Sequence, residues 1–334
     1  MPNHLPSPPP GRPASNLPAR KATELFEDIV ANMARVIQGK DNAIRLALVC
    51  LMAQGHVLIE DVPGVGKTSL AKALASSIAC DWQRIQFTPD LLPSDITGVN
   101  VFNRSTSTFE FRPGAVFANI VLGDEINRAS PKTQSALLEA MGEGQVTVDR
   151  VTYRLPAPFM VIATQNPIEH EGTYPLPESQ LDRFLLQITM GYPDRTAERA
   201  MLEAHGRSDL LGTLTPVAGS ADVANLISGA HSVFVAPTIQ EYLVDLAQGT
   251  RAHPGLALGM SPRSGLALQG AARAWAWAQG RDYVVPDDIK ELAQPVLGHR
   301  MVASLRGAHH RGVEECLNEV LNTVPVPVGQ TTQA

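Results

Sequence analysis

Apolar residues recur at three- and four-residue intervals near the start of the chain, which is typical of a helix buried on one side. The residues with this spacing are Leu25, Phe26, Ile29, Val30, Met33 and Ile37. Gly39 interrupts the pattern, and Asp41 can cap a second helix that ends at Gly55. Two amphipathic helices are therefore predicted before the first strand.

Short apolar runs that predict strands then alternate with helical patterns. The predicted strands cover residues 56–60, 84–88, 119–122 and 159–163. Leu70, Leu74 and Ile78 have helical spacing, and Ser130-Pro131 starts a helix that we expect Gly142 to end. Strands separated by helices predict an α/β fold, with a parallel sheet covered by helices on both faces.

Two hairpins are predicted inside this α/β part. In the first, residues 99–103 and 108–112 flank a polar turn. In the second, residues 145–148 and 151–155 flank Asp149-Arg150, where Arg150 stands at a position that suits glycine better.

Beyond Tyr192-Pro193 the strand signal fades and helical patterns dominate, at 195–205, 238–247, 261–279 and 286–293. Seven prolines between residues 2 and 18 favour disorder at the start of the chain. We therefore expect four regions: a disordered proline-rich arm (1–21), an α/β nucleotide-binding domain (22–192), a smaller all-α domain (193–326) and a disordered tail (327–334).

The segment Asp61 to Thr68, with the sequence DVPGVGKT, joins the first predicted strand to a helix. Gly64 and Gly66 allow sharp turns that point backbone N–H groups inward, and the helix adds its positive N-terminal end. Lys67 can then reach the β- and γ-phosphates of a nucleotide, and the Thr68 hydroxyl can bind Mg²⁺. The alternative is an ordinary Gly-Pro turn.

One position departs from the usual G-x-x-x-x-G-K-[ST] pattern, because Asp61 stands at the first glycine. Aspartate tolerates a left-handed backbone better than most residues, so the loop is not excluded. We also expect Pro63, Val65 and Ser69 to belong to the nucleotide-binding loop.

An apolar strand ends in two acids, Asp124 and Glu125. Asp124 would bind Mg²⁺ directly or through water, and Glu125 would polarise the water that attacks the γ-phosphate. A solvated loop is the alternative for such a pair. The phosphate loop earlier in the chain favours the catalytic interpretation.

Three further side chains are candidates. Asn166 follows the last predicted strand, where it could hold the attacking water, although an Asn-Pro turn would also explain it. Arg183 and Arg263 could each form a buried salt bridge. Arg263 lies in the first turn of a helix, where a cation opposes the helix dipole and a bound phosphate would remove that conflict.

Together these segments closely resemble the MoxR family of AAA+ ATPases over residues 23–325. The segments that carry the resemblance are Val36–Lys40, the phosphate loop, Asp124–Pro131, Ala163–Pro167, Leu181–Phe184 and Ser261–Arg263. The sequence EDVPGVGKT, with aspartate at this position, is a familiar form in that family. Residues 90–117 resemble the helix 2 insert of the wider clade.

The resemblance implies that this chain binds ATP and Mg²⁺. Val36, Ile37 and Gly39 are similar to the segment that lines the adenine pocket in the family. Lys67 and Thr68 resemble its Walker A residues.

Catalytic roles are implied in the same way. Asp124 and Glu125 resemble Walker B, and Asn166 resembles sensor 1. Arg183 resembles the arginine finger, and Arg263 resembles the sensor 2 arginine, which could serve its own subunit's nucleotide or a neighbour's.

A finger that acts in a neighbouring subunit implies a homo-oligomer, usually a hexameric ring. Both hairpins would then face a central pore or a partner. Members of the family are associated with maturation of protein complexes, with cofactor or metal insertion, and with clients that carry von Willebrand factor A domains.

Composition limits the alternatives. A net charge of −6 argues against a basic nucleic-acid-binding face, although an AAA+ nucleic-acid motor stays open. The chain lacks the Asn-Lys-x-Asp signature of a GTPase.

No apolar run reaches the ~20 residues of a membrane span, and three widely spaced cysteines suit reduced thiols. We therefore expect a cytoplasmic protein without direct membrane insertion.

Overall fold

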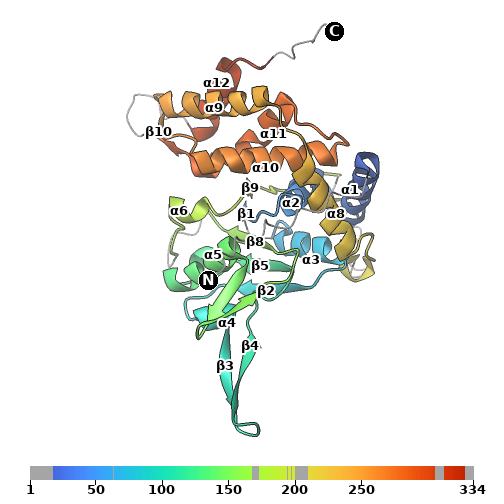
Figure 1. The fold of residues 1–334 in the computed structure, drawn as a ribbon, viewed down its shortest axis with the longest axis vertical. Coiled ribbons are helices and arrows are strands. Elements are labelled where there is room, and N and C mark those ends of the chain that lie inside the picture. The colour runs from blue at the N-terminus through green and yellow to red at the C-terminus, as the bar shows by residue number, and fades with distance from the viewer. Residues whose placement is uncertain are drawn as a thin grey trace, which may run out of the picture.

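Five parallel strands form the central sheet of the protein, in the order β2-β5-β8-β1-β9 (Figure 1). The computed structural model describes residues 18–62, 64–167, 173–193, 195–196, 198–199, 210–304 and 312–327. The sheet strands are β1 (Val57–Glu60), β2 (Trp82–Gln86), β5 (Ile120–Asp124), β8 (Met160–Gln165) and β9 (Leu186–Ile188). The first four match the predicted strands, whereas β9 was not predicted.

Alternate residues of these strands enter two different hydrophobic cores, because successive side chains of a strand point to opposite faces. Val57 and Ile59 pack in the core with α1 (Ala19–Ala34), α2 (Asp41–Met52) and α3 (Lys67–Ser77). Leu58 lies in the core of the other face, which α5 (Pro131–Glu143) covers. Helices on both faces of a parallel sheet confirm the predicted α/β fold class.

The last turn of α5 differs from the prediction. Ser130 caps the helix as expected, and its hydroxyl accepts a hydrogen bond from the Thr133 N–H at 3.4 Å. The helix continues past Gly142 to Glu143 and ends at Gly144, whose φ of 61° is left-handed. A Cβ at position 142 would lie 2.5 Å from a guanidinium nitrogen of Arg183, so a larger residue there would displace the end of that flexible side chain.

Both predicted hairpins are present. The first consists of β3 (Gly98–Asn103) and β4 (Thr108–Pro113), which extend away from the sheet after α4 (Pro93–Thr97) (Figure 1). The second consists of β6 (Gln145–Val148) and β7 (Val151–Arg154). Asp149 and Arg150 have φ angles of 49° and 70°, the left-handed geometry that a two-residue turn of this kind needs.

A smaller, mainly helical part follows the sheet and packs through α10 onto α1 and α2 (Figure 1). Its helices are α8 (Ser220–Ser232), α9 (Pro237–Ala252), α10 (Pro262–Ala278), α11 (Pro286–Leu297) and α12 (Val313–Thr323). A short antiparallel pair, β10 (Leu256–Leu258) and β11 (Val302–Ala303), was not predicted. The remaining short elements are η1 (Ile126–Arg128), α6 (Glu178–Leu181), η2 (Leu210–Thr213) and η3 (Gly298–Arg300).

The ends of the chain are described only in part. Helix α1 begins at Ala19, so residues 19–21, which we assigned to the arm, are helical. Residues 1–17 and 328–334, and most of the helix expected at 195–205, lie outside the described residues. Across the described ranges, no helix is long and apolar enough to cross a membrane.

One buried histidine is held in its neutral form where the two cores meet. His56 Nδ1 accepts a hydrogen bond from the Val161 N–H at 3.0 Å, and its Nε2–H donates to the Met141 carbonyl at 3.1 Å. Burial lowers the pKa of His56 to about 4. Protonation would remove the acceptor that Val161 uses and place a charge in an apolar environment.

Acidification should therefore destabilise the protein between pH 6.5 and 4. In this window the unfolded histidine binds a proton and the folded one does not, so stability falls as pH falls, by up to about 1.4 kcal/mol per pH unit for this group. The His56→Gln variant should be less stable at pH 7, but its free energy of unfolding, measured with urea at several pH values, should depend less steeply on pH. His299, whose pKa burial also lowers to about 4, titrates in both proteins. Equal slopes would contradict the assignment.

Candidate functional site

The parallel register brings three chain segments to one edge of the sheet. Glu60 at the end of β1 pairs with Gln165 of β8, and Gly123 of β5 pairs with Ala163 of β8. The phosphate loop, the acid pair and Asn166 therefore all follow the carboxyl ends of neighbouring strands. Ligands of open α/β sheets bind at such an edge.

The loop after β1 has the backbone of a phosphate-binding loop. Gly64 and Gly66 have φ angles of +87° and +95°, a left-handed geometry that favours glycine. Lys67 starts α3, and its ammonium donates to the Asp61 carbonyl at 2.7 Å. Thr68 and Ser69 follow, half-buried, in the first turn of α3. Loop N–H groups and the helix N-terminus suit an anion.

Asp61, Pro63 and Val65 also belong to the loop sequence. Pro63 lies outside the described residues. Val65 is half-buried and packs against the core. Asp61 is not among the described residues with positive φ, so its backbone does not use the left-handed geometry that aspartate tolerates. Its carboxylate instead accepts backbone hydrogen bonds, which a glycine could not do.

The two acids after β5 are oriented by a buried hydroxyl that sequence analysis missed. Thr164 Oγ1 donates to Asp124 Oδ1 at 2.6 Å and accepts from the Glu125 N–H at 2.9 Å. Glu125 has φ 59° and ψ 52°, so the chain turns sharply between the two acids. Thr164 is fully buried and lies two residues before Asn166 on β8.

Both carboxylates also contact polar or cationic side chains. Arg84, on β2, contacts Asp124 Oδ2 at 2.6 Å. Glu125 Oε2 accepts from the Gln86 amide at 3.0 Å and lies 3.2 Å from Arg128 Nε. A metal ion on Asp124 would have to compete with the Arg84 guanidinium.

The oxygen atoms at this edge suit Mg²⁺ better than a softer metal. Asp124 supplies a carboxylate and Thr68 a hydroxyl, and α3 packs against β5. No group of three His, Cys, Asp or Glu side chains that could hold a metal occurs within the described residues. An ion here would therefore need ligands from phosphate and water, as is usual for Mg²⁺.

Asn166 is buried directly after β8, at the same edge. Arg183 has a different environment: its guanidinium donates to the Leu138 carbonyl of α5 at 2.7 Å. Figure 1 shows α6, which precedes Arg183, on the other side of β1 from α3. The structure thus places Asn166 at the sheet edge that carries the acids, and it connects Arg183 to α5.

Arg263 lies at the start of α10, where Ser261 caps the helix, with its side chain 63% exposed. Its Nε is 3.2 Å from Asp182 Oδ2, so Arg263 forms a salt bridge, but a largely exposed one rather than the buried one that was the alternative. Arg300, which sequence analysis missed, also lies 3.4 Å from the Asp182 carboxylate and donates to the Phe184 carbonyl at 2.7 Å. Burial lowers the pKa of Arg300 to about 10.

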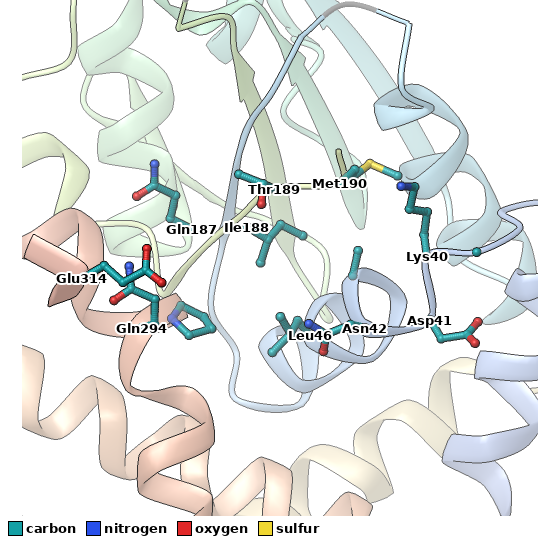
Figure 2. A pocket seen from close by; sticks show the side chains of 13 residues that line it. Lys40, Asp41, Asn42, Leu46, Gln187, Ile188, Thr189, Met190, Gln294 and Glu314 are labelled. Carbon is teal, nitrogen blue, oxygen red and sulfur yellow. The ribbon is translucent and has the colours of Figure 1, made fainter. Parts of the chain in front are cut away.

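A cavity of about 590 Å³ lies between the sheet and the helical part (Figure 2). Its wall includes residues 39–43, residues 187–190 at the end of β9, and Gln294, Pro295 and Glu314 of α11 and α12. Of the predicted adenine residues only Gly39 lines it, because Ile37 is buried in the core and Val36 packs against that core. The Met190 methyl would lie 3.8 Å from a Cβ on Gly66, so the cavity adjoins the phosphate loop.

Comparisons with known proteins agree with this geometry. Residues 56–186 match the "ATPase family associated with various cellular activities (AAA)", and residues 248–320 match the "AAA lid domain". The chain is 52% identical to the uncharacterized protein YeaC of Bacillus subtilis, over 91% of this chain and 95% of that protein.

Chaperone MoxR1 of Mycobacterium tuberculosis is 41% identical, over 90% of this chain and 82% of MoxR1. The crystal structure of a presumptive ATPase from Cytophaga hutchinsonii superposes with a TM-score of 0.86 at 34% identity. That superposition covers 93% of this chain and 97% of the other.

The Thr164 hydroxyl offers a test of the acid pair. Thr164→Val keeps the buried volume but removes one hydrogen bond to Asp124 and one to Glu125. Leaving a buried polar group without its hydrogen bond costs about 1–3 kcal/mol, and here the loss also frees the two acids to move. The kcat for ATP hydrolysis should therefore fall on the order of ten-fold or more. ATP affinity should change little, since the loop is untouched. Thr164→Ser, which keeps the hydroxyl, is the control, and equal kcat values for the two variants would refute this role.

Proposed function

Because this chain belongs to the MoxR family of AAA+ ATPases, we propose that it is a Mg²⁺-dependent ATPase of an oligomeric ring that remodels client proteins. The observation that carries the proposal is the sheet edge, where Thr164 orients Asp124 and Glu125 beside the phosphate loop. These groups match the needs of ATP hydrolysis by a water nucleophile.

Each part of the nucleotide has a candidate partner. The cavity next to Met190 holds the nucleoside, and its wall offers polar side chains from Asn42, Gln187 and Gln294 (Figure 2). The loop N–H groups and Lys67 bind the phosphates, so the Lys67 ammonium leaves the Asp61 carbonyl. The cavity volume lies within the usual range for small-molecule sites.

The reaction then depends on side chains at the carboxyl edge. Thr68 and Asp124 hold Mg²⁺, which neutralises charge on the β- and γ-phosphates. Glu125 polarises the attacking water, and Asn166 positions it. Arg84 and Arg128 keep the two acids paired, so nucleotide binding must redirect these cations.

A neighbouring subunit supplies the remaining cation in this proposal. Arg183 contacts α5, on the other side of β1 from the helix that follows the phosphate loop (Figure 1). It therefore serves a nucleotide of the next subunit, in a ring that we propose to be hexameric. Arg263, exposed at the start of α10, assists in its own or the adjacent site.

We propose that the ring acts in the cytoplasm on client proteins. The relative named Chaperone MoxR1 supports this class of activity. The resemblance to the family adds von Willebrand factor A domain proteins as candidate clients, with complex maturation or cofactor or metal insertion as the outcome. The extended β3–β4 hairpin is suitably placed to reach such a client (Figure 1).

Glu125→Gln should separate binding from hydrolysis. The amide keeps the shape of the side chain but cannot act as a base, so turnover should fall on the order of a hundred-fold or more while ATP still binds. Steady-state ATPase assays and equilibrium binding of a fluorescent ATP analogue measure the two effects. Glu139→Gln, an exposed glutamate on α5, is the matched control. Unchanged turnover in Glu125→Gln would defeat the proposed mechanism.

Mixing two inactive variants tests whether subunits share sites. Lys67→Ala lacks a working phosphate loop but keeps Arg183, and Arg183→Ala has the reverse defect. In a mixed ring, the intact Arg183 of one variant meets the intact loop of the other, so activity should return towards a fraction of the wild-type rate. Arg20→Ala, at a side chain 91% exposed on α1, controls for loss of an arginine. A mixture as inactive as its components, despite verified co-assembly, would rule out action in trans.

A further inference from the structure

Asp61 connects the phosphate loop to the segment that follows β9. The residue is only 8% exposed, and its carboxylate accepts hydrogen bonds from three backbone N–H groups. These come from Val62 at 2.8 Å, Met190 at 2.7 Å and Gly191 at 2.5 Å. Such bonds to an ionised acceptor are about twice as strong as neutral ones.

The backbone of Asp61 has two further partners at the site. Its N–H donates to the Gln165 carbonyl at 3.2 Å, directly before Asn166 on β8. Its carbonyl accepts from the Lys67 ammonium at 2.7 Å. One residue therefore contacts the lysine of the loop, the strand that ends just before Asn166, and the chain after β9.

The segment held by Asp61 leaves the sheet at Met190 and leads towards the helical part. Met190 lines the cavity, and its methyl lies beside Gly66. Gly191 has a φ of +64°, a sharp turn that glycine permits. Lys40 donates to the Tyr192 carbonyl at 2.6 Å, which fixes the far end of this turn.

From this arrangement we propose that Asp61 is a positioning residue, which couples occupancy of the phosphate loop to the placement of the segment that leads into the helical part. The inference rests on the proposed binding of ATP at the loop. A phosphate draws the Lys67 ammonium away from the Asp61 carbonyl, which frees the peptide between Asp61 and Val62 to rotate. The carboxylate carries that movement to Met190 and Gly191.

Two substitutions separate this role from phosphate binding. Asp61→Asn keeps the size of the side chain but loses the charge and presents an amide N–H₂ group as well as one oxygen. Asp61→Gly removes the link and restores the residue that the usual phosphate loop has at this position. Asp222→Asn, which alters an exposed carboxylate that caps α8 through the Gly219 N–H, is the matched control.

The test measures amide hydrogen exchange in the full chain with and without β,γ-imido-ATP and Mg²⁺. In the wild type, the analogue should slow exchange in peptides of the loop and change exchange in peptides covering residues 189–193. In Asp61→Asn and Asp61→Gly, protection of the loop should persist, but the response at 189–193 should be lost. Amides of Met190 and Gly191 should exchange on the order of ten-fold faster without nucleotide, since their acceptor is weakened in Asp61→Asn and absent in Asp61→Gly.

Kinetic constants give a second readout, because a loss of stability alone would not lower kcat while leaving the affinity for the analogue nearly unchanged. Both variants should bind the analogue within a few-fold of wild type, while kcat falls on the order of ten-fold. Asp222→Asn should match wild type in both assays. A nucleotide-dependent change at 189–193 that survives in both Asp61 variants, or that is absent in wild type with analogue bound, would overturn the inference. Failure of the wild type to bind the analogue would instead overturn the proposed function beneath it.

Discussion

The parallel register of β5, β8 and β1 is the constraint on which the site depends. Because the three strands end at one edge, residues about 100 positions apart, such as Glu60 and Gln165, become neighbours. The apolar strands fix this register, since each buries side chains in a core on both faces. A one-residue slip of β8 would exchange those faces and move the Thr164 hydroxyl away from Asp124 and Glu125.

The two acids at the carboxyl edge of the sheet form ion pairs with arginines of the same chain. Arg84 contacts Asp124 and Arg128 contacts Glu125, whereas Asp182, which precedes β9, contacts Arg263 and Arg300. Most of these arginines are partly exposed, so each pair contributes at most about 1 kcal/mol. In the proposed reaction, a bound nucleotide with Mg²⁺ would offer Asp124 and Glu125 stronger partners than these arginines. Arg300 is the exception, because its guanidinium is buried and holds the segment around Asp182 against the helical part.

Features set by local sequence could be predicted, and features set by tertiary contacts could not. Periodicity placed four of the five sheet strands, both hairpins and most helices, and the strand ends placed the loop and the acids. It missed β9, which has three residues, and Gly142 was taken for the end of α5, although the helix continues to Glu143 and ends at Gly144. Thr164, Arg84 and the carboxylate contacts of Asp61 join segments distant in sequence, and no local pattern signals them.

In the proposed function, one chain carries only part of a hydrolytic site and a neighbouring subunit completes it. The most direct measurement is the rate of ATP hydrolysis per subunit across a range of protein concentrations, with the assembly state followed by sedimentation. If neighbouring subunits complete the site, the rate should be very low for the dilute monomer and should rise to a plateau as rings form. A rate per subunit that stays constant and high in verified monomers would contradict it.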